Sequence, residues 1–421
     1  MQVAEGYKQT EVGVIPEDWE TYTLKQITLD ILQGVNTAID IPIYVLDGVP
    51  MLKANNVIDQ QVKFDGASHI SRQTFSRYSD RFKARKNDFL FSNIGARLGT
   101  GSILTTNTEC SFAWNVMRIV PNPNKVEPVL LSSLMNSPLY SGMIKDSQSG
   151  SGMGFVPKTV MQNLVLALPP TLAEQEAIAE ALSDADSLIE SLQQLIAKKR
   201  QIKQGAMQEL LQPKPDWVEK ALGELADTSI KWSFTGGPFG SNLKSSDYTN
   251  DGVRIVQLQN IGDGRFKLES QIYTSLKKAN ELVSCNIYPN EIILSKMGDP
   301  VARACIVPNA HTRYLMCSDG IRLAVNKKQY NTFFIFTLLN APTFREKAYN
   351  AGTGSTRRRI GLKELRTLTL YVPPLEKQTR IATILSDMDS EITSLETKLT
   401  KAQQIKQGMM SELLTGKTRL I

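Results

Sequence analysis

The sequence contains few residues that form disulfides or bind transition metals, with 4 cysteines and 2 histidines among its 421 residues. Cys110, Cys285, Cys305 and Cys317 include no C-x-x-C pair, so their spacing argues against a zinc site. We therefore predict that the cysteines are buried and reduced, and that the chain holds no metal. Reduced cysteines are typical of cytoplasmic proteins, and we expect this location.

Long apolar segments are also missing. The most apolar run, residues 333–339, is far shorter than the roughly 20 residues that a helix needs to cross a bilayer. The N-terminal residues contain no apolar core of a signal peptide. We interpret residues 333–339 as a buried helix and expect no membrane association.

The familiar catalytic motifs are absent. The glycine-rich runs at residues 149–154 and 352–357 are not followed by the Gly-Lys-Ser/Thr of a phosphate-binding loop. No G-x-S-x-G or H-E-x-x-H motif occurs. An adenine methyltransferase needs Asn or Asp directly before a Pro-Pro pair, whereas the pairs here follow Leu168 and Val372. No cluster of nuclease carboxylates stands out, so we predict no catalytic residue.

The charge of the chain is mildly positive. Lys and Arg outnumber Asp and Glu by 48 to 42, which gives a formal net charge of +6 and a pI near 8.9. Such an excess permits a polyanionic partner without requiring one. The hydrophobic content of 41% is ordinary, and a chain of this length and composition is expected to fold into two or three domains.

An internal repeat organises the sequence. The string IKQG occurs at residues 202–205 and again at 405–408, an offset of 203, and SD and ELL recur at the same offset. Weaker matches upstream pair Asn56 with Asn260 and Asn136 with Asn340. The order is thus globular segment, helix, globular segment, helix. The helices are more alike than the globular segments. We infer that the helices share one structural role while the globular segments bind different ligands, although free drift after duplication is the alternative.

The two helical segments carry the heptad pattern of a coiled coil. Each follows a Pro-Pro pair, and apolar residues recur at alternating steps of four and three. A helix over residues 173–211 would be about 59 Å long, too long to bury its apolar stripe against a small domain. A two-fold relation between the repeats predicts that the helices pair antiparallel. The predicted pairing residues are Ile178, Leu182, Ile189, Leu192, Ile381, Leu385, Ile392 and Leu395. Lys199 interrupts the first stripe.

Further apolar residues widen this stripe. Ala181, Leu188, Leu195 and Ile384 lie beside the seam of a two-helix coiled coil. Either a partner helix covers them, or they face the globular segments. The sequence leaves both possibilities open.

The globular segments read as mixed α/β. Strand-like runs at residues 253–258, 291–295 and 304–307 alternate with turns, and short helices are expected near 129–136 and 332–340. Several loops combine glycine, which lets backbone approach a ligand, with side chains that contact phosphates or base edges. The candidate DNA-binding residues are Arg97, Lys158, Asn242, Lys244, Lys296, Arg303, Arg357 and Arg358. Arg77, Arg81, Lys83, Arg85 and Lys86 add a basic patch. The alternative is that these charges are solvated surface.

The repeated segments resemble a known family. VPPLEKQTRIATILSDMDSEI and IKQGMMSELLTGKTRLI are similar to the helical regions of specificity (S) subunits of type I restriction-modification enzymes. YKQTEVGVIPEDWE, LPPTLAEQEAIAEALSDAD and GTGSTRRRIGLKEL show the same resemblance, which extends over essentially the whole chain.

This resemblance implies a non-catalytic, DNA-binding subunit. Two target-recognition domains, residues 1–168 and 213–372, would each read one half of a split site in double-stranded DNA. The long helices, residues 169–212 and 373–421, would join them. Two modification subunits with S-adenosylmethionine, and restriction subunits with ATP and Mg, would complete the complex, and this chain would hold no cofactor. The alternatives are a self-contained DNA methyltransferase or nuclease, and a coiled-coil scaffold without DNA binding.

Overall fold

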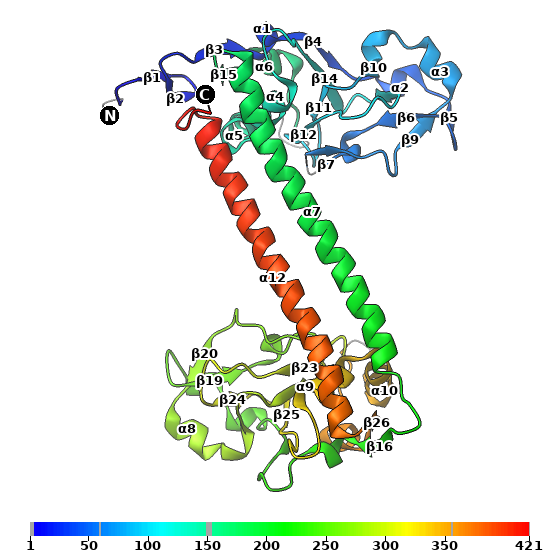
Figure 1. Cartoon of the computed structure of the whole chain (residues 1–421), viewed down its shortest axis with the longest axis vertical. Helices are drawn as coiled ribbons and strands as arrows, with labels where there is room; N and C mark the ends of the chain where they lie inside the picture. The colour runs from blue at the N-terminus through cyan, green and yellow to red at the C-terminus, as the bar shows by residue number, and fades with distance from the viewer. Residues whose placement is uncertain (1–3, 59, 149–153, 355–356, 421) are drawn as a thin grey trace. The chain divides into compact units, whose positions relative to one another are not determined.

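The computed structural model describes residues 4–58, 60–148, 154–354 and 357–420, and it divides into two compact units (Figure 1). Unit 1 comprises residues 1–194 and 397–421, and unit 2 comprises residues 195–396. Both boundaries lie inside the long helices, so each unit contains one globular body together with one end of each helix. Most of the glycine-rich run at 149–154, and part of the one at 352–357, lie outside the described residues.

The two larger sheets of unit 1 have four and five strands. The four-stranded sheet has the order β12 (Gly101–Ile103), β11 (Phe89–Ser92), β14 (Val116–Pro121) and β4 (Thr28–Gln33). The five-stranded sheet has the order β10 (Lys83–Ala84), β13 (Cys110–Phe112), β6 (Val49–Leu52), β9 (Ser68–Ile70) and β5 (Tyr44–Val45). Its larger helices are α3 (Arg72–Arg77), α4 (Pro128–Met135), α5 (Pro138–Asp146) and α6 (Lys158–Asn163).

Unit 2 repeats this architecture. Its four-stranded sheet has the order β17 (Phe234–Gly236), β25 (Gly320–Leu323), β22 (Ile292–Ser295) and β23 (Ala304–Ile306). Its five-stranded sheet has the order β18 (Tyr248–Thr249), β20 (Ile272–Thr274), β19 (Val253–Val256), β24 (Tyr314–Met316) and β21 (Asn286–Ile287). Its helices include α8 (Leu276–Glu281), α9 (Thr332–Asn340), α10 (Pro342–Ala351) and α11 (Leu362–Thr367). The mixed α/β prediction is therefore confirmed in both halves.

A further pair of short strands closes each globular body next to its long helix. In unit 1, β3 (Glu20–Thr23) pairs antiparallel with β15 (Val165–Leu168), and in unit 2, β16 (Val218–Ala221) pairs with β26 (Thr369–Val372). A Pro-Pro pair follows β15 and β26, and proline suits the first turn of a helix because its missing N–H is not needed there. The long helices begin at these points.

Helices α7 (Leu172–Leu210) and α12 (Leu375–Leu413) pair antiparallel within each unit (Figure 1). In unit 2 the Lys199 ammonium lies 2.7 Å from Glu391, and Lys203 pairs with Asp389, so residue numbers rise on one helix as they fall on the other. In unit 1, Lys406 lies 2.5 Å from Asp186. Lys406 and Asp186 are the repeat counterparts of Lys203 and Asp389, so each unit contains the same ion pair with the helices exchanged.

The predicted apolar stripe is only partly buried. Six of the eight predicted pairing residues are buried, while Ile189 and Leu192 are half-buried. Leu188, Leu195 and Ile384 are 55%, 38% and 43% exposed, so the described globular residues do not cover them. Lys199 is accommodated in the stripe through its ion pair with Glu391.

The helix ends belong to the core of each unit. Ile178 and Leu182 of α7 pack in one buried cluster with Trp19 and with Leu413 of α12. In unit 2, Ile381 and Leu385 of α12 join the corresponding cluster around Trp217. Within the described ranges, no helix combines the length and apolar character needed to cross a bilayer.

Candidate nucleic-acid interface

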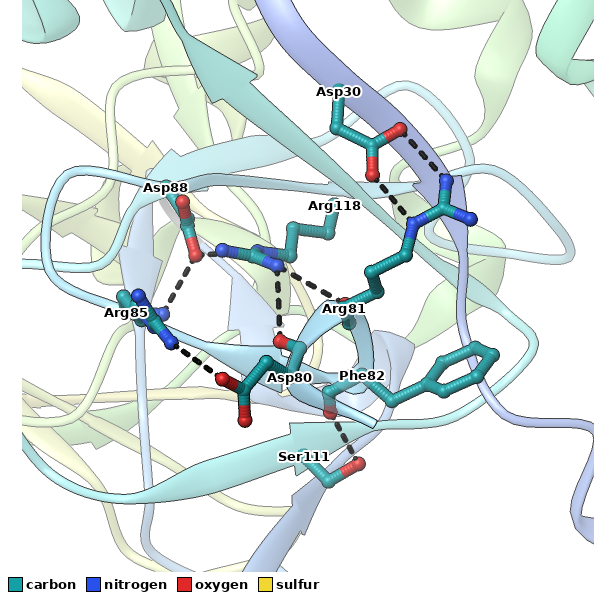
Figure 2. Close-up of polar contacts among 8 residues, drawn as sticks. All are labelled: Asp30, Asp80, Arg81, Phe82, Arg85, Asp88, Ser111 and Arg118. Atoms are coloured by element: carbon teal, nitrogen blue, oxygen red, sulfur yellow. Dashed lines mark hydrogen bonds and ion pairs between the residues drawn. The ribbon is translucent and has the colours of Figure 1, made fainter. Parts of the chain in front are cut away.

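A buried ion pair fixes the same strands in both units. In unit 1 the Arg118 Nε of β14 lies 2.5 Å from Oδ2 of Asp88, just before β11 (Figure 2). In unit 2, Arg322 of β25 donates two hydrogen bonds to Glu291, at 2.8 and 2.6 Å, just before β22. Each pair holds the central strands in register, and the loops that follow β11 and β22 carry several of the candidate residues.

Buried or half-buried asparagines hold further loops and helices in place. The Asn136 side-chain amide donates to the carbonyl of Gly101, and Asn340 donates to the carbonyl of Ala304, which ties α4 to β12 and α9 to β23. Asn56 and Asn260 each accept a backbone N–H three residues upstream and donate to a carbonyl seven residues downstream. These amides recur in the repeat because they are structural.

Two candidate residues of unit 1 lie on neighbouring segments. Arg97 is exposed in the loop after β11, where Gly95 has a φ of 88°. The N–H of Gly95 donates to the carbonyl of Gly154 at 3.1 Å, which places this loop beside the segment that leads into α6. Lys158 is the first residue of α6 and is half-buried. The fold therefore brings the loop of Arg97 close to the segment of Lys158.

The basic patch of unit 1 is largely neutralised inside the unit (Figure 2). Arg81 donates two hydrogen bonds to Asp30, at 2.9 and 3.0 Å, and these bonds lower the pKa of Asp30. Lys83 and Arg85 each lie 3.2 Å from a carboxylate oxygen of Asp80. Three of the five cations thus have a carboxylate partner, and this favours the interpretation of the patch as ordinary surface.

Two candidate DNA-binding residues of unit 2 donate hydrogen bonds to backbone carbonyls of the same unit. Arg303 donates from Nε to the carbonyl of Ile261 at 3.1 Å. Arg358 donates to the carbonyls of Tyr349 and Gly352, both at 2.9 Å, and its guanidinium stacks 3.7 Å from the Tyr349 ring centroid. These contacts fix the orientation of both side chains, and their predicted contact with DNA stays a prediction. Asn242, Lys244 and Arg357 are exposed.

Lys296 and Arg359 lie together at the end of β22. The Lys296 ammonium donates to the carbonyl of Ser318 at 2.9 Å and lines an open pocket of about 410 Å³ with Arg359. Burial lowers the pKa of Lys296, and the nearby Arg359 guanidinium lowers it further. Arg359 also lies 3.2 Å from Asp319. The sequence pointed to Lys296 but not to Arg359 individually, because three consecutive arginines give no sign of which one faces a ligand.

The sequence matches the profile of the type I restriction modification DNA specificity domain twice, over residues 16–200 and 214–407. The two matches cover most of the chain and follow its internal repeat. The chain belongs to this family.

Relatives of this specificity-domain family align with all or part of the chain. The MjaX type I restriction enzyme specificity subunit of Methanocaldococcus jannaschii is 26% identical over 99% of this chain and 97% of its own length. The EcoBI specificity subunit of Escherichia coli is 24% identical over 46% of this chain and 41% of its own. A crystal structure of a type I restriction-modification system S subunit from M. genitalium has the same fold, with a TM-score of 0.61 at 14% identity over 98% of both chains.

Membership of the specificity-domain family confirms the resemblance found in the repeats. It favours a DNA-recognition subunit over a self-contained methyltransferase or nuclease and over a scaffold without DNA binding. Among the described residues, no group of three or more His, Cys, Asp or Glu side chains is placed to hold a metal ion.

Proposed function

We propose that this specificity-domain protein is the sequence-reading subunit of a type I restriction-modification complex, and that each unit reads one part of a bipartite site in double-stranded DNA. The observation that carries the proposal is the duplication itself. Both units keep the same strand order, the same ion pair between two central strands and the same asparagine contacts, while their loops differ in sequence. Two domains with the same strand framework and different loops are suited to recognise two different DNA sequences.

The helices carry the second part of the proposal. Leu188, Leu195 and Ile384 are large apolar side chains that remain exposed on α7 and α12. Exposed apolar side chains of this size on a long helix mark a surface for partners. We propose that two modification subunits dock here and that restriction subunits join the complex, with S-adenosylmethionine, ATP and Mg bound by those partners. The chain itself is then non-catalytic and acts in the cytoplasm with the DNA.

Exchange of one target-recognition domain tests whether each unit recognises its own half of the DNA site. Residues 20–160 are replaced by the matching segment of a relative, and the chain is expressed with its partner subunits in a host whose methylated sites are then sequenced. We expect one half of the recognised site to change and the other to stay. A change in both halves would contradict independent reading. The unmodified chain, purified without partners, should bind DNA in a salt-dependent way but show no methyl transfer, cleavage or ATP hydrolysis.

The helices also join the two units covalently, and we propose that they set the spacer between the two half-sites. One heptad inserted into each helix, at residues 194 and 396, adds about 10.5 Å of helix and nearly preserves its face. This length corresponds to about three base pairs at roughly 3.4 Å each. Methylated-site sequencing should show unchanged half-sites with a longer spacer, and an unchanged spacer in an active variant would refute the idea.

A further inference from the structure

At one corner of the four-stranded sheet, the two units have the same backbone arrangement but chemically different side chains. Gln33, the last residue of β4, lies opposite Met117 of β14, and Gly236, the last residue of β17, lies opposite Ile321 of β25. Strand register therefore makes Gln33 and Gly236 equivalent. The residues that directly follow β11 and β22 are likewise equivalent, and they are Asn93 and Lys296.

In unit 1 this corner is closed by two amides. The Gln33 amide donates to Asn93 Oδ1 at 3.0 Å, and the Asn93 amide donates to Gln33 Oε1 at 2.9 Å. The Gln33 amide also donates to the carbonyl of Trp114. Asn93 is fully buried. The two side chains thus satisfy each other, and little hydrogen-bonding capacity remains for a ligand.

In unit 2 the lysine ammonium takes the place of the glutamine amide. Gly236 has no side chain, and a Cβ at this position would lie 2.7 Å from the Lys296 Nζ. The ammonium donates to the carbonyl of Ser318, which precedes β25 by the same two residues as Trp114 precedes β14. An ammonium has three donors, so this one bond leaves two for a ligand in the adjoining pocket.

At two neighbouring positions, too, a neutral side chain in unit 1 corresponds to a charged side chain in unit 2. Phe155 forms a bridge with Ile94 in unit 1, and its counterpart Arg359 forms a bridge with Met297 in unit 2. Asn115, which directly precedes β14, corresponds to Asp319, which directly precedes β25 and pairs with Arg359. The corner of unit 2 therefore presents two cationic donors beside a carboxylate.

The charge balance of this corner indicates the kind of ligand. Glu364 also lines the pocket, and its carboxylate lies against Gly361 at the start of α11. Two cations and two carboxylates make a nearly neutral surface, which attracts a phosphate weakly. A base edge with adjacent acceptor atoms suits the Lys and Arg donors better, and guanine O6 and N7 are the acceptors that these side chains most often contact.

We propose that the Lys296–Arg359 corner of unit 2 reads a guanine in one half of the DNA site, and that unit 1 has no equivalent reader because Gln33 and Asn93 fill the same place. This inference rests on the proposed function of the chain. It identifies Arg359 as a specificity-determining residue and Gly236 as the position that makes room for Lys296.

The corner can be converted to the pattern of unit 1. The double variant Gly236→Gln, Lys296→Asn installs the amide pair, and Arg359→Gln removes an exposed guanidinium without disturbing a buried group. Each variant is expressed with its partner subunits, and methylated sites are sequenced. Lys277→Gln, on α8, removes one exposed cation from the same unit as a control. Circular dichroism and thermal unfolding of the purified chains confirm that they fold.

We expect the half-site read by unit 2 to lose its requirement for guanine at one position in both corner variants, with the other half-site unchanged. Binding to the cognate duplex should weaken about 10-fold or more, which is the usual discrimination of a bidentate contact. Uniform weakening on all duplexes would identify a phosphate contact and overturn the proposal, as would full guanine specificity in folded Arg359→Gln. If the unmodified complex methylates no defined sequence, this result contradicts the proposed function of the chain. A result that contradicts only the role of the Lys296–Arg359 corner requires an unmodified complex that does methylate a defined sequence.

Discussion

Unit 1 and unit 2 share an ion pair between two central strands and differ in charge. The counts of Lys and Arg against Asp and Glu are 20 against 22 in unit 1 and 28 against 20 in unit 2, so unit 2 holds the whole positive excess of the chain. The buried pairs Arg118–Asp88 and Arg322–Glu291 nevertheless occupy the same place. A buried polar group cannot lose its partner cheaply, whereas surface charge can change freely. The duplicated frame is therefore retained while the surface that meets a ligand diverges.

The largest effect should come from breaking the retained ion pair. Arg322→Met leaves the Glu291 carboxylate without its guanidinium partner, and such a change typically costs about 3–5 kcal/mol of stability. Arg118→Met should have at least as large an effect in unit 1, because the Asp88 side chain is 4% exposed and that of Glu291 is 11% exposed. Hydrogen exchange resolved by peptide shows which unit is destabilised. If either variant weakened both units equally, the units would not be separate folding bodies.

A smaller and matched effect is expected at two glutamines. Gln175 accepts the N–H of Glu127, the residue that precedes α4, and Gln378 accepts the N–H of Asn331, which precedes α9, both at 2.9 Å. Each side chain also donates to the first carbonyl of the local Pro-Pro pair. Replacement by alanine leaves buried backbone groups unpaired, so each variant should lose about 1–3 kcal/mol. Denaturant unfolding measures the loss, and Gln404→Ala on the exposed face of α12 should lose almost none.

The sequence predicted the frame better than the site. Helix periodicity, strand runs and repeated asparagines are local or recurrent signals, and they located α7, α12, β19, β22, α4 and α9. The fate of a surface arginine depends on distant partners. Arg303 donates a hydrogen bond to the carbonyl of Ile261, which is 42 residues away in the sequence. The residues next to Arg303 in the sequence do not predict this bond. The sequence also did not predict that Gly236 and Lys296 replace Gln33 and Asn93. The two residues of each pair are 60 positions apart in the sequence, and the difference appears only when both positions of the pair are compared.

The exposed cations should separate the units by their response to salt. Lys244 and Arg357 are exposed in unit 2, and Arg77 and Lys86 are exposed in unit 1, where their neighbours have carboxylate partners. Each lost phosphate contact reduces the slope of log affinity against log salt by about 0.9. We expect Lys244→Gln with Arg357→Gln to reduce the slope, and Arg77→Gln with Lys86→Gln to change it less. Fluorescence anisotropy at several salt concentrations measures the slope for each variant. Equal reductions of the slope in both variants would show that the exposed cations of the two units contribute equally to DNA binding.

The smallest effect concerns the aspartates before the buried tryptophans. Asp18 pairs with Arg419 of the C-terminal tail at 2.9 Å, and Asp216 pairs with Lys377 of α12 at 3.0 Å. Hydrogen bonds from these cations lower the pKa of both carboxyl groups below the usual value of 3.8. A carboxyl group with a lowered pKa stabilises the fold above its unfolded pKa, and this contribution is lost as the pH falls through the folded pKa.

Replacement of one cation should reveal this dependence. Lys377→Gln should make unit 2 slightly less stable at pH 7, because an exposed ion pair contributes little. The difference from the unmodified chain should begin to shrink near pH 4 and disappear as the pH falls through the lowered folded pKa of Asp216, because protonation of Asp216 removes its ion pair with Lys377. Urea unfolding at pH 7 and at pH 3 measures the two differences, with Lys277→Gln as the control for loss of one exposed charge. A difference as large at pH 3 as at pH 7 would mean that Lys377 stabilises unit 2 through the packing of its methylenes and not through Asp216.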